Sequence, residues 1–434
     1  MISKDAAIQV VAVETNQITF SMKTRLAVYV FIYSSLTLLI NYILYNHFKH
    51  DSLDQVDKLC SPTSEISEES NREENIPLPS VSTNYSCTKP VKSIVYLKTH
   101  KTGSTSWKSV FLFYGEKRNL TICMDSVNKW QLNWPYRIHI ERIIKAHYEK
   151  CDILADEMVY DEETVRKLMP STYITITSVR HPIEHFFSMY RYVGLHKAVE
   201  RLTNKTLEKF EAMRIFFKHP LLLQNIWATY SYQPNVQLIQ PNLQLYTLGL
   251  NTTNPQQILK MSNKINYFII SEFNDESLVL LKKGMCCQFE DLLYRKQNVG
   301  RSGKKEEIVP KDIEESILKF NQGDLILYNI ALKRYRQQVK AYHHFENDVK
   351  VFREKQKIYQ DTCLYLEKKK DPSLNKKCIP KDFQTYFRDV HERQKSRLTK
   401  SLKAHGFVEA KDKNKKTLDF NYQTTGYANT HGQF

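Results

Sequence analysis

The chain has 434 residues, of which 41% are hydrophobic and 25% are charged. This composition, with only 11 glycines and 14 prolines, excludes a collagen-like chain and a chain that is disordered throughout. The formal net charge of +16 at pH 7 favours an anionic partner, such as a nucleic acid, an acidic membrane surface or a small phosphorylated ligand. No compact basic stripe with interleaved aromatic residues occurs, so we expect no nucleic acid partner.

The first apolar segment, residues 26–48, contains no Asp, Glu, Lys or Arg. A helix needs about 20 apolar residues to cross the hydrocarbon core of a bilayer, so this segment is long enough. A cleaved signal peptide fits less well, because residues 1–25 are long for its charged region and no small-residue cleavage pattern follows. We therefore predict a cytosolic tail at 1–25 and a transmembrane signal anchor at 26–48.

The charges on either side of the anchor indicate its orientation. Lys4, Lys23 and Arg25 precede it, whereas acidic residues follow it within 51–76. Because positive residues tend to stay in the cytosol, the rest of the chain should face the lumen, as in a single-pass type II membrane protein.

The cysteines and the glycosylation sequons agree with a lumenal location. All eight cysteines follow the predicted anchor, as do four Asn-x-Ser/Thr sites, at Asn84, Asn119, Asn204 and Asn251. We expect some disulfides and leave their pairing open, except that the adjacent Cys286 and Cys287 should not bond to each other. No C-x-x-C pair has a partner pair and no metal-ligand cluster is visible, so we predict no metal site.

The remaining chain divides into a stem, a folded domain and a tail. Residues 49–91 are rich in Ser, Glu, Asn and Pro, which predicts a disordered stem. We predict a lumenal domain at 92–400 and a basic, flexible tail at 401–434.

Within the domain, one pattern of apolar strand, polar turn and amphipathic helix occurs three times. The strands are expected at 93–98, 173–179 and 266–271, and the helices show apolar residues at i, i+3, i+4 and i+7. This alternation predicts an α/β fold with a central parallel sheet flanked by helices. Beyond Asp312 the pattern becomes mainly helical through Lys370, which predicts a helix-rich C-terminal part.

The turn after the first strand, KTHKTGSTS at 98–106, is the most informative stretch. Gly103 lets the backbone approach a ligand closely, and Ser104 begins a helix whose free N–H groups attract anions. The lysines and hydroxyls supply further donors, so the turn predicts a cradle for a 5′-phosphate. The alternative is an ordinary Ser/Thr helix cap with two surface lysines. Lys101 precedes the glycine, unlike in G-x-x-x-x-G-K-[ST], which disfavours an ATP-using kinase.

A second anion site is expected after the second strand. Arg180 follows that strand directly, and Ser188 lies on the next helix. If the two strands are neighbours, both side chains can bind a second phosphate, with the guanidinium making a bidentate contact. The alternative is a purely structural Arg-x-Pro turn.

Three segments resemble the Golgi galactose-3-O-sulfotransferases, the family of galactosylceramide sulfotransferase. They are KTHKTGSTS, SVRHPIEHFFSMYRY and INYFIISEFNDESLVLLKKGMCCQFEDLLYRK, and the likeness runs from about Lys92 to Cys363. The resemblance implies a P-loop-like sulfotransferase fold and 3′-phosphoadenosine 5′-phosphosulfate as co-substrate. It also implies transfer of a sulfuryl group to the 3-hydroxyl of galactose on a glycolipid or glycan, at the Golgi membrane.

The resemblance also implies which residues bind the co-substrate. The family's 3′-phosphate site falls on Arg180 and Ser188, although His181 stands where the family often has Asp. Its 5′-phosphosulfate loop falls on Lys98, Thr99, Lys101, Thr102, Gly103, Ser104, Thr105 and Ser106.

Sulfuryl transfer needs a base for the alcohol and a cation for the leaving oxygen. His100 is the expected base, because an imidazole is partly neutral near neutral pH. Lys101, with Lys98 behind it, is the expected cation. His147 is a second candidate for the base, because the family carries a histidine in a comparable segment. Glu272, after the third strand, is expected to contact the sugar or to cap the next helix.

Other functions remain open at this stage. The acceptor can be another carbohydrate hydroxyl, such as one on a glycosaminoglycan. A lumenal glycosyltransferase shares the membrane topology, but many such enzymes use an Asp-x-Asp metal site, which this chain lacks. An inactive glycan-binding protein on the same fold is the third alternative, and a homodimer is a further possibility.

Overall fold

The computed structural model describes residues 89–126, 131–143, 150–219, 238–295 and 308–404, with the backbone alone at 401–404. The predicted anchor at 26–48, most of the predicted stem and His147 lie outside these residues. Among the described residues, no helix is both long and apolar enough to cross a membrane. The described residues all belong to the compact unit that begins at Leu78.

The centre of this unit is a parallel sheet. Its strands are β1 (Ile94–Leu97), β2 (Ile153–Leu154), β3 (Ile174–Val179) and β4 (Tyr267–Ile270), in the order β2-β1-β3-β4. The predicted strands at 93–98, 173–179 and 266–271 are confirmed as β1, β3 and β4. The sequence did not predict β2, which has only two residues.

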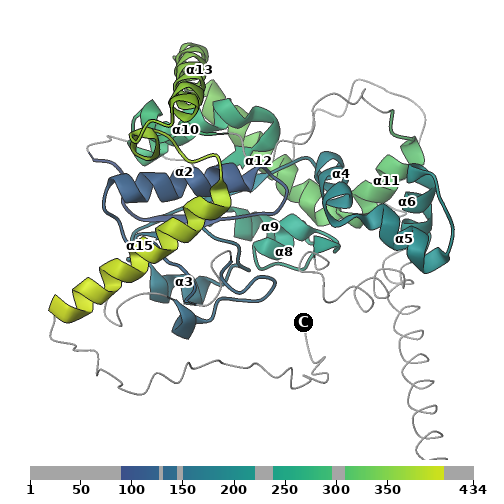
Figure 1. Cartoon of the computed structure of the whole chain (residues 1–434). Coiled ribbons are helices and arrows are strands. Elements are labelled where there is room, and N and C mark those ends of the chain that lie inside the picture. The colour runs from purple at the N-terminus through teal and green to yellow at the C-terminus, as the bar shows by residue number, and fades with distance from the viewer. Residues whose placement is uncertain (1–88, 127–130, 144–149, 220–237, 296–307, 405–434) are drawn as a thin grey trace, which may run out of the picture. The chain divides into compact units, whose positions relative to one another are not determined.

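Helices cover both faces of the sheet (Figure 1). Successive side chains of a strand point to opposite faces, so Ile94 and Tyr96 join one buried cluster and Val95 and Leu97 join another. The first cluster is completed by α2 (Ser104–Lys117), α10 (Asn274–Met285), α13 (Phe345–Lys369) and α15 (Phe383–Ala404). The second is completed by α3 (Glu162–Leu168), α9 (Pro255–Ser262) and α12 (Gln322–Lys340). The α/β prediction is therefore confirmed.

A third buried cluster lies beside the sheet. It contains apolar residues from helices that also lie together in Figure 1: α4 (Pro182–Val193), α5 (Leu195–Thr203), α6 (Lys209–Lys218) and α11 (Lys311–Phe320). The helix-rich C-terminal part is confirmed, because α11 to α15 follow one another. Shorter helices are α8 (Leu243–Thr247), α14 (Leu374–Lys377), η1 (Ile140–Arg142), η3 (Ser271–Phe273) and η4 (Phe289–Asp291).

The strand order reverses its direction at β1. From β1 the chain continues to β2 on one side, and it then returns to β3 on the other side of β1. In open parallel sheets, ligands bind outside the carboxyl ends of the strands at such a reversal. The loop after β1 and the turn after β3 both lie at this point.

The disulfides explain part of the cysteine content. Cys123 bonds to Cys151, and Cys363 bonds to Cys378. Cys286 is also disulfide-bonded, whereas Cys287 is a buried free thiol. The expectation that Cys286 and Cys287 do not bond to each other is confirmed.

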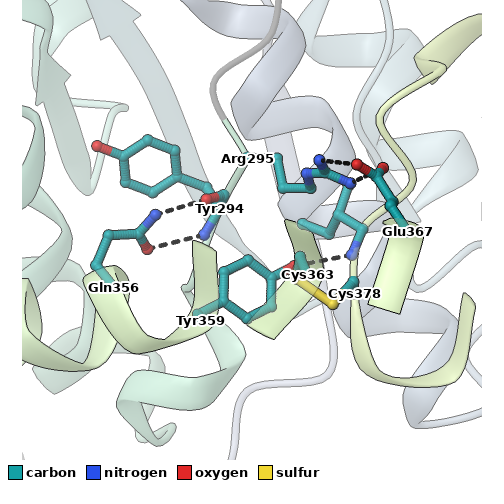
Figure 2. The surroundings of a disulfide bond; sticks show 8 residues. Tyr294, Arg295, Gln356, Tyr359, Cys363, Glu367 and Cys378 are labelled. Carbon is teal, nitrogen blue, oxygen red and sulfur yellow. Dashed lines mark hydrogen bonds and ion pairs between the residues drawn. A yellow bond between two sulfur atoms is a disulfide. The ribbon is translucent and has the colours of Figure 1, made fainter. Parts of the chain in front are cut away.

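The second disulfide fixes α13 to the chain that follows it (Figure 2). Beside it, Tyr359 Oη accepts a hydrogen bond of 2.8 Å from the backbone N–H of Ile379. The guanidinium of Arg295 makes a bidentate ion pair with Glu367. These contacts hold the C-terminal half of α13 to Arg295 and to the chain that follows the helix.

Candidate functional site

The loop between β1 and α2 ends in a left-handed turn that leaves the start of the helix uncapped. Lys101 and Gly103 have φ values of 61° and 73°. Gly103 is the N-cap of α2, no side chain caps the helix, and its first turn contains no acidic residue. The first N–H groups of a helix have no intrahelical acceptor. The ordinary Ser/Thr cap that the sequence left open is therefore absent.

The hydroxyls of the loop are directed at β3. Thr99 and Thr102 are fully buried, and their Oγ1 atoms are 3.0 Å apart. Thr102 Oγ1 lies 2.6 Å from Ser178 Oγ, and Thr99 donates a hydrogen bond to the carbonyl oxygen of Ser178. In this structure the two threonine hydroxyls hold the loop against its neighbouring strand.

The two predicted phosphate motifs lie next to each other. Arg180 Nη1 donates a hydrogen bond of 3.4 Å to the carbonyl oxygen of Lys101. The side chain of Gln244 holds the backbone of Arg180 by two hydrogen bonds. Gln244 Oε1 accepts one of 2.9 Å from the N–H of Arg180, and Gln244 Nε2 donates one of 3.0 Å to the carbonyl oxygen of Arg180. Ser188 is partly buried on α4, and no hydrogen bond joins it to the loop among the described residues.

A positive field surrounds Lys101. Its ammonium lies 3.7 Å above the ring of Tyr192. Burial and the positive charges of Lys98, Arg180 and Arg191 together lower the pKa of Lys101 to about 8, although Glu157 acts in the opposite direction. A lysine that is less easily protonated among other cations indicates a place where an anion would be stabilised.

Lys98 and His100 share one carboxylate, that of Glu157. Lys98 donates to Glu157 Oε1, and His100 Nε2 lies 3.3 Å from Oε2. Burial by itself would raise the pKa of Glu157, but the charges of Lys98 and His100 hold it well below its ordinary value. The ammonium of Lys98 is therefore engaged in an ion pair in this structure.

Aromatic and histidine side chains hold His100. The ring of Trp134 lies 4.3 Å from the ring of His100, measured between centroids. His185 is buried, and its Nε2 lies 2.9 Å from the carbonyl oxygen of His100. Burial lowers the pKa of His185 to about 4, so this ring is neutral and donates the hydrogen bond.

Residues after β4 contact the loop after β1 and the turn after β3. Glu272 accepts from the backbone N–H of His181 at 2.9 Å, so it stabilises the turn after β3. Ser271 Oγ donates to the carbonyl oxygen of Thr102 at 3.1 Å, which brings the end of β4 to the same loop. His147 is not among the described residues. The described part of the chain contains no group of three or more His, Cys, Asp or Glu that could hold a metal ion.

Sequence reasoning missed Glu157, Trp134, Tyr192 and Gln244. Glu157 follows a strand of only two residues, which no periodicity reveals. Tyr192 was open to prediction, because it lies four residues after Ser188 on the same face of α4. The contacts of Trp134 and Gln244 depend on tertiary packing alone.

Comparisons with known proteins identify the family of the chain. The family model of galactose-3-O-sulfotransferase matches residues 9–378. Human galactosylceramide sulfotransferase is 30% identical over 225 residues, which cover 49% of this chain and 49% of that protein. Human galactose-3-O-sulfotransferase 3 is 25% identical over 248 residues, which cover 55% of this chain and 54% of that protein. The alignments thus span about half the length of these relatives. Since the family match covers most of the sequence, the chain belongs to the galactose-3-O-sulfotransferase family.

Proposed function

We propose that the protein transfers a sulfuryl group from 3′-phosphoadenosine 5′-phosphosulfate to the 3-hydroxyl of a galactose residue. One observation carries this proposal: the uncapped N-terminus of α2 lies beside Arg180, at the ends of two neighbouring strands. Two anion sites at the ends of adjacent strands suit a nucleotide with phosphates at both ends of its ribose. Membership of the family supports the reaction class.

The residues of the loop suit the 5′ end of this donor. Backbone N–H groups at the start of α2 and the dipole of the helix favour a phosphate there. The N-cap position is a glycine with φ of 73°, so no Cβ stands between the backbone and a ligand. We assign Lys101 to Ser106 to the 5′-phosphosulfate, and Arg180 with Ser188 to the 3′-phosphate.

The chemical step needs a proton acceptor and a cation. The donor supplies the sulfuryl group when it is bound. His100 accepts the proton of the galactose hydroxyl as the new O–S bond forms. Lys101 neutralises the negative charge that develops on the phosphate oxygen as the old S–O bond breaks. His147 remains the alternative base.

We propose the same cellular setting that the sequence predicts. In it, residues 26–48 anchor the protein in the Golgi membrane, 49–91 form the stem and the domain at 92–400 faces the lumen. The disulfides Cys123–Cys151 and Cys363–Cys378 support this, because such bonds persist in oxidising compartments. The expected tail at 401–434 and a homodimer belong to the same proposal.

An acceptor panel tests the function. The full-length protein, purified in detergent, is incubated with the 35S-labelled donor and one of three acceptors: a galactose-terminated glycolipid, a galactose-terminated glycan or a glycosaminoglycan. Label on either galactoside is the expected result. Label on the glycosaminoglycan alone would favour a different carbohydrate sulfotransferase, and label on no acceptor would contradict the proposal.

A further inference from the structure

Glu157 lies between two of the proposed reactive groups. Its Oε1 accepts a hydrogen bond from Lys98, and its Oε2 lies 3.3 Å from His100 Nε2. The side chains of Lys98 and His100 are only 6% and 10% exposed. Water therefore screens these contacts weakly, and the carboxylate fixes where each partner points.

The ring of His100 is also held from outside this pair. Trp134 packs against the ring, and His185 donates a hydrogen bond to the carbonyl oxygen of His100. A ring constrained in this way presents its two nitrogens in fixed directions, with Nε2 toward Glu157.

The two ring nitrogens have different surroundings. A neutral imidazole carries one proton, and a carboxylate beside Nε2 favours the proton on that atom. Nδ1 of His100 then has a free lone pair. It is buried and, among the residues that the structure describes, has no hydrogen-bond partner. Leaving such an atom unpaired is costly, so the site gains when a ligand hydroxyl reaches it.

We propose that Glu157 is a positioning residue that keeps His100 protonated on Nε2, so that Nδ1 accepts the proton of the incoming hydroxyl. The inference rests on the proposed function. As the hydroxyl oxygen bonds to sulfur, its proton passes to Nδ1. The bond from sulfur to the phosphate oxygen breaks, and its electron pair stays on that oxygen beside Lys101. The resulting imidazolium faces the carboxylate of Glu157, which stabilises it.

The backbone of Glu157 is fixed by a second, deeper contact. Asp156 Oδ1 accepts a hydrogen bond of 2.8 Å from the backbone N–H of Glu157 and one of 2.6 Å from Lys108 Nζ. Lys108 lies on α2, the helix whose start is the proposed phosphate site. The same helix therefore holds the phosphate cradle at its first turn and the support of Glu157 one turn later.

The test replaces the carboxylate with its neutral isostere in the full-length protein. Glu157→Gln should lower kcat by about a hundredfold or more, while the KM values change little. Lys98, Lys101 and His185, the other ionisable groups near the ring, are unchanged in this variant.

Two controls separate positioning from structure. Glu163→Gln removes a carboxylate that is 77% exposed on α3, and it should leave kcat and KM unchanged. Glu157→Asp keeps the charge and should recover part of kcat. Calorimetric binding of 3′-phosphoadenosine 5′-phosphate, the desulfated donor, reports whether each variant is folded.

A double variant separates the two partners of Glu157. In the Lys98→Met background, Glu157→Gln should still lower kcat, because its effect passes through His100. If Glu157→Gln has no effect in that background, the carboxylate serves Lys98 alone and the inference is wrong.

The remaining outcomes distinguish the inference from the proposed function. An active wild-type protein with an equally active Glu157→Gln variant overturns the inference only. A wild-type protein that transfers no sulfate to any galactoside overturns the proposed function, and the inference with it.

Discussion

Arg180 reaches across from the end of β3 to the loop after β1, where its Nη1 atom lies 3.4 Å from the carbonyl oxygen of Lys101. The contact exists because β1 and β3 are adjacent and parallel, with Leu97 opposite Thr177. Their carboxyl ends therefore meet at one edge of the sheet. Two basic side chains from distant parts of the sequence are brought to one place, and this is the basis of the proposed donor site.

Removal of the Arg180 guanidinium should weaken the binding of 3′-phosphoadenosine 5′-phosphate. Hydrogen bonds to charged groups contribute roughly 1.5–3 kcal/mol, so Arg180→Ala should raise the Kd about ten- to a hundredfold. Isothermal titration calorimetry measures this change. Arg388→Ala, on the exposed surface of α15, removes the same charge and should leave the Kd unchanged. An unchanged Kd in Arg180→Ala would contradict the assignment of this residue.

A side chain at Gly103 should disturb the phosphate cradle. Its φ of 73° is unfavourable for a residue with Cβ, at a cost of about 1–2 kcal/mol. Gly103→Ala should lower the free energy of unfolding by about this amount and should also weaken binding of the desulfated donor. Gly194 has φ of 65° and no neighbour within 4 Å of a built Cβ. Gly194→Ala should therefore lose a similar free energy of unfolding but bind the desulfated donor as the wild type does. If both variants bind this ligand equally well, Gly103 does not form part of the phosphate site.

Donor affinity should fall as the pH rises past about 8. The pKa of Lys101 is lowered to about 8 by burial and by Lys98, Arg180 and Arg191, against the opposing effect of Glu157. A bound phosphate favours the charged ammonium, so binding should take up protons above that pH and should weaken once the ammonium is lost. Calorimetry in buffers of different ionisation enthalpy measures this proton uptake.

An arginine at position 101 provides the matched comparison, because it stays charged across this range. Lys101→Arg should bind the desulfated donor with an affinity that changes much less between pH 7 and pH 9. A steep loss of affinity in both proteins would place the titrating group elsewhere.

The Cys363–Cys378 disulfide should contribute to stability rather than to catalysis. The two cysteines are 15 residues apart in the sequence. By restricting the unfolded chain, a disulfide that closes a loop of this length stabilises the folded state by about 3 kcal/mol. The double variant Cys363→Ser/Cys378→Ser should therefore unfold at lower urea concentration. Donor binding at low temperature should persist, because α13 is held to the domain by other contacts as well (Figure 2). An unchanged unfolding midpoint would contradict this expectation.

The sequence predicts the repeated local pattern well and the tertiary contacts poorly. The strands β1, β3 and β4 and the helices after them follow from apolar periodicity, and the glycine and serines of the loop predict the start of α2. The sequence alone does not predict that β1 and β3 are adjacent, since strand order depends on tertiary packing.

The candidate site shows the same division. Lys101 and Arg180 are readable from their positions at strand ends, because parallel strands bring such ends together. Glu157 is not readable in this way, because its strand pairs only Ile94 with Ile153 and Val95 with Leu154. The disulfide partners could not be deduced either, because spacing alone allows many pairings.

The most direct test of the account compares two acceptors that differ in one hydroxyl. The full-length protein is incubated with the 35S-labelled donor and either a terminal β-galactoside or its 3-deoxy analogue. Labelled product is then quantified and the sulfate is located by mass spectrometry. The account predicts label at O3 of the galactoside, none on the 3-deoxy analogue, and none on either acceptor with His100→Ala. Equal labelling of both acceptors, or wild-type transfer by His100→Ala, would contradict it.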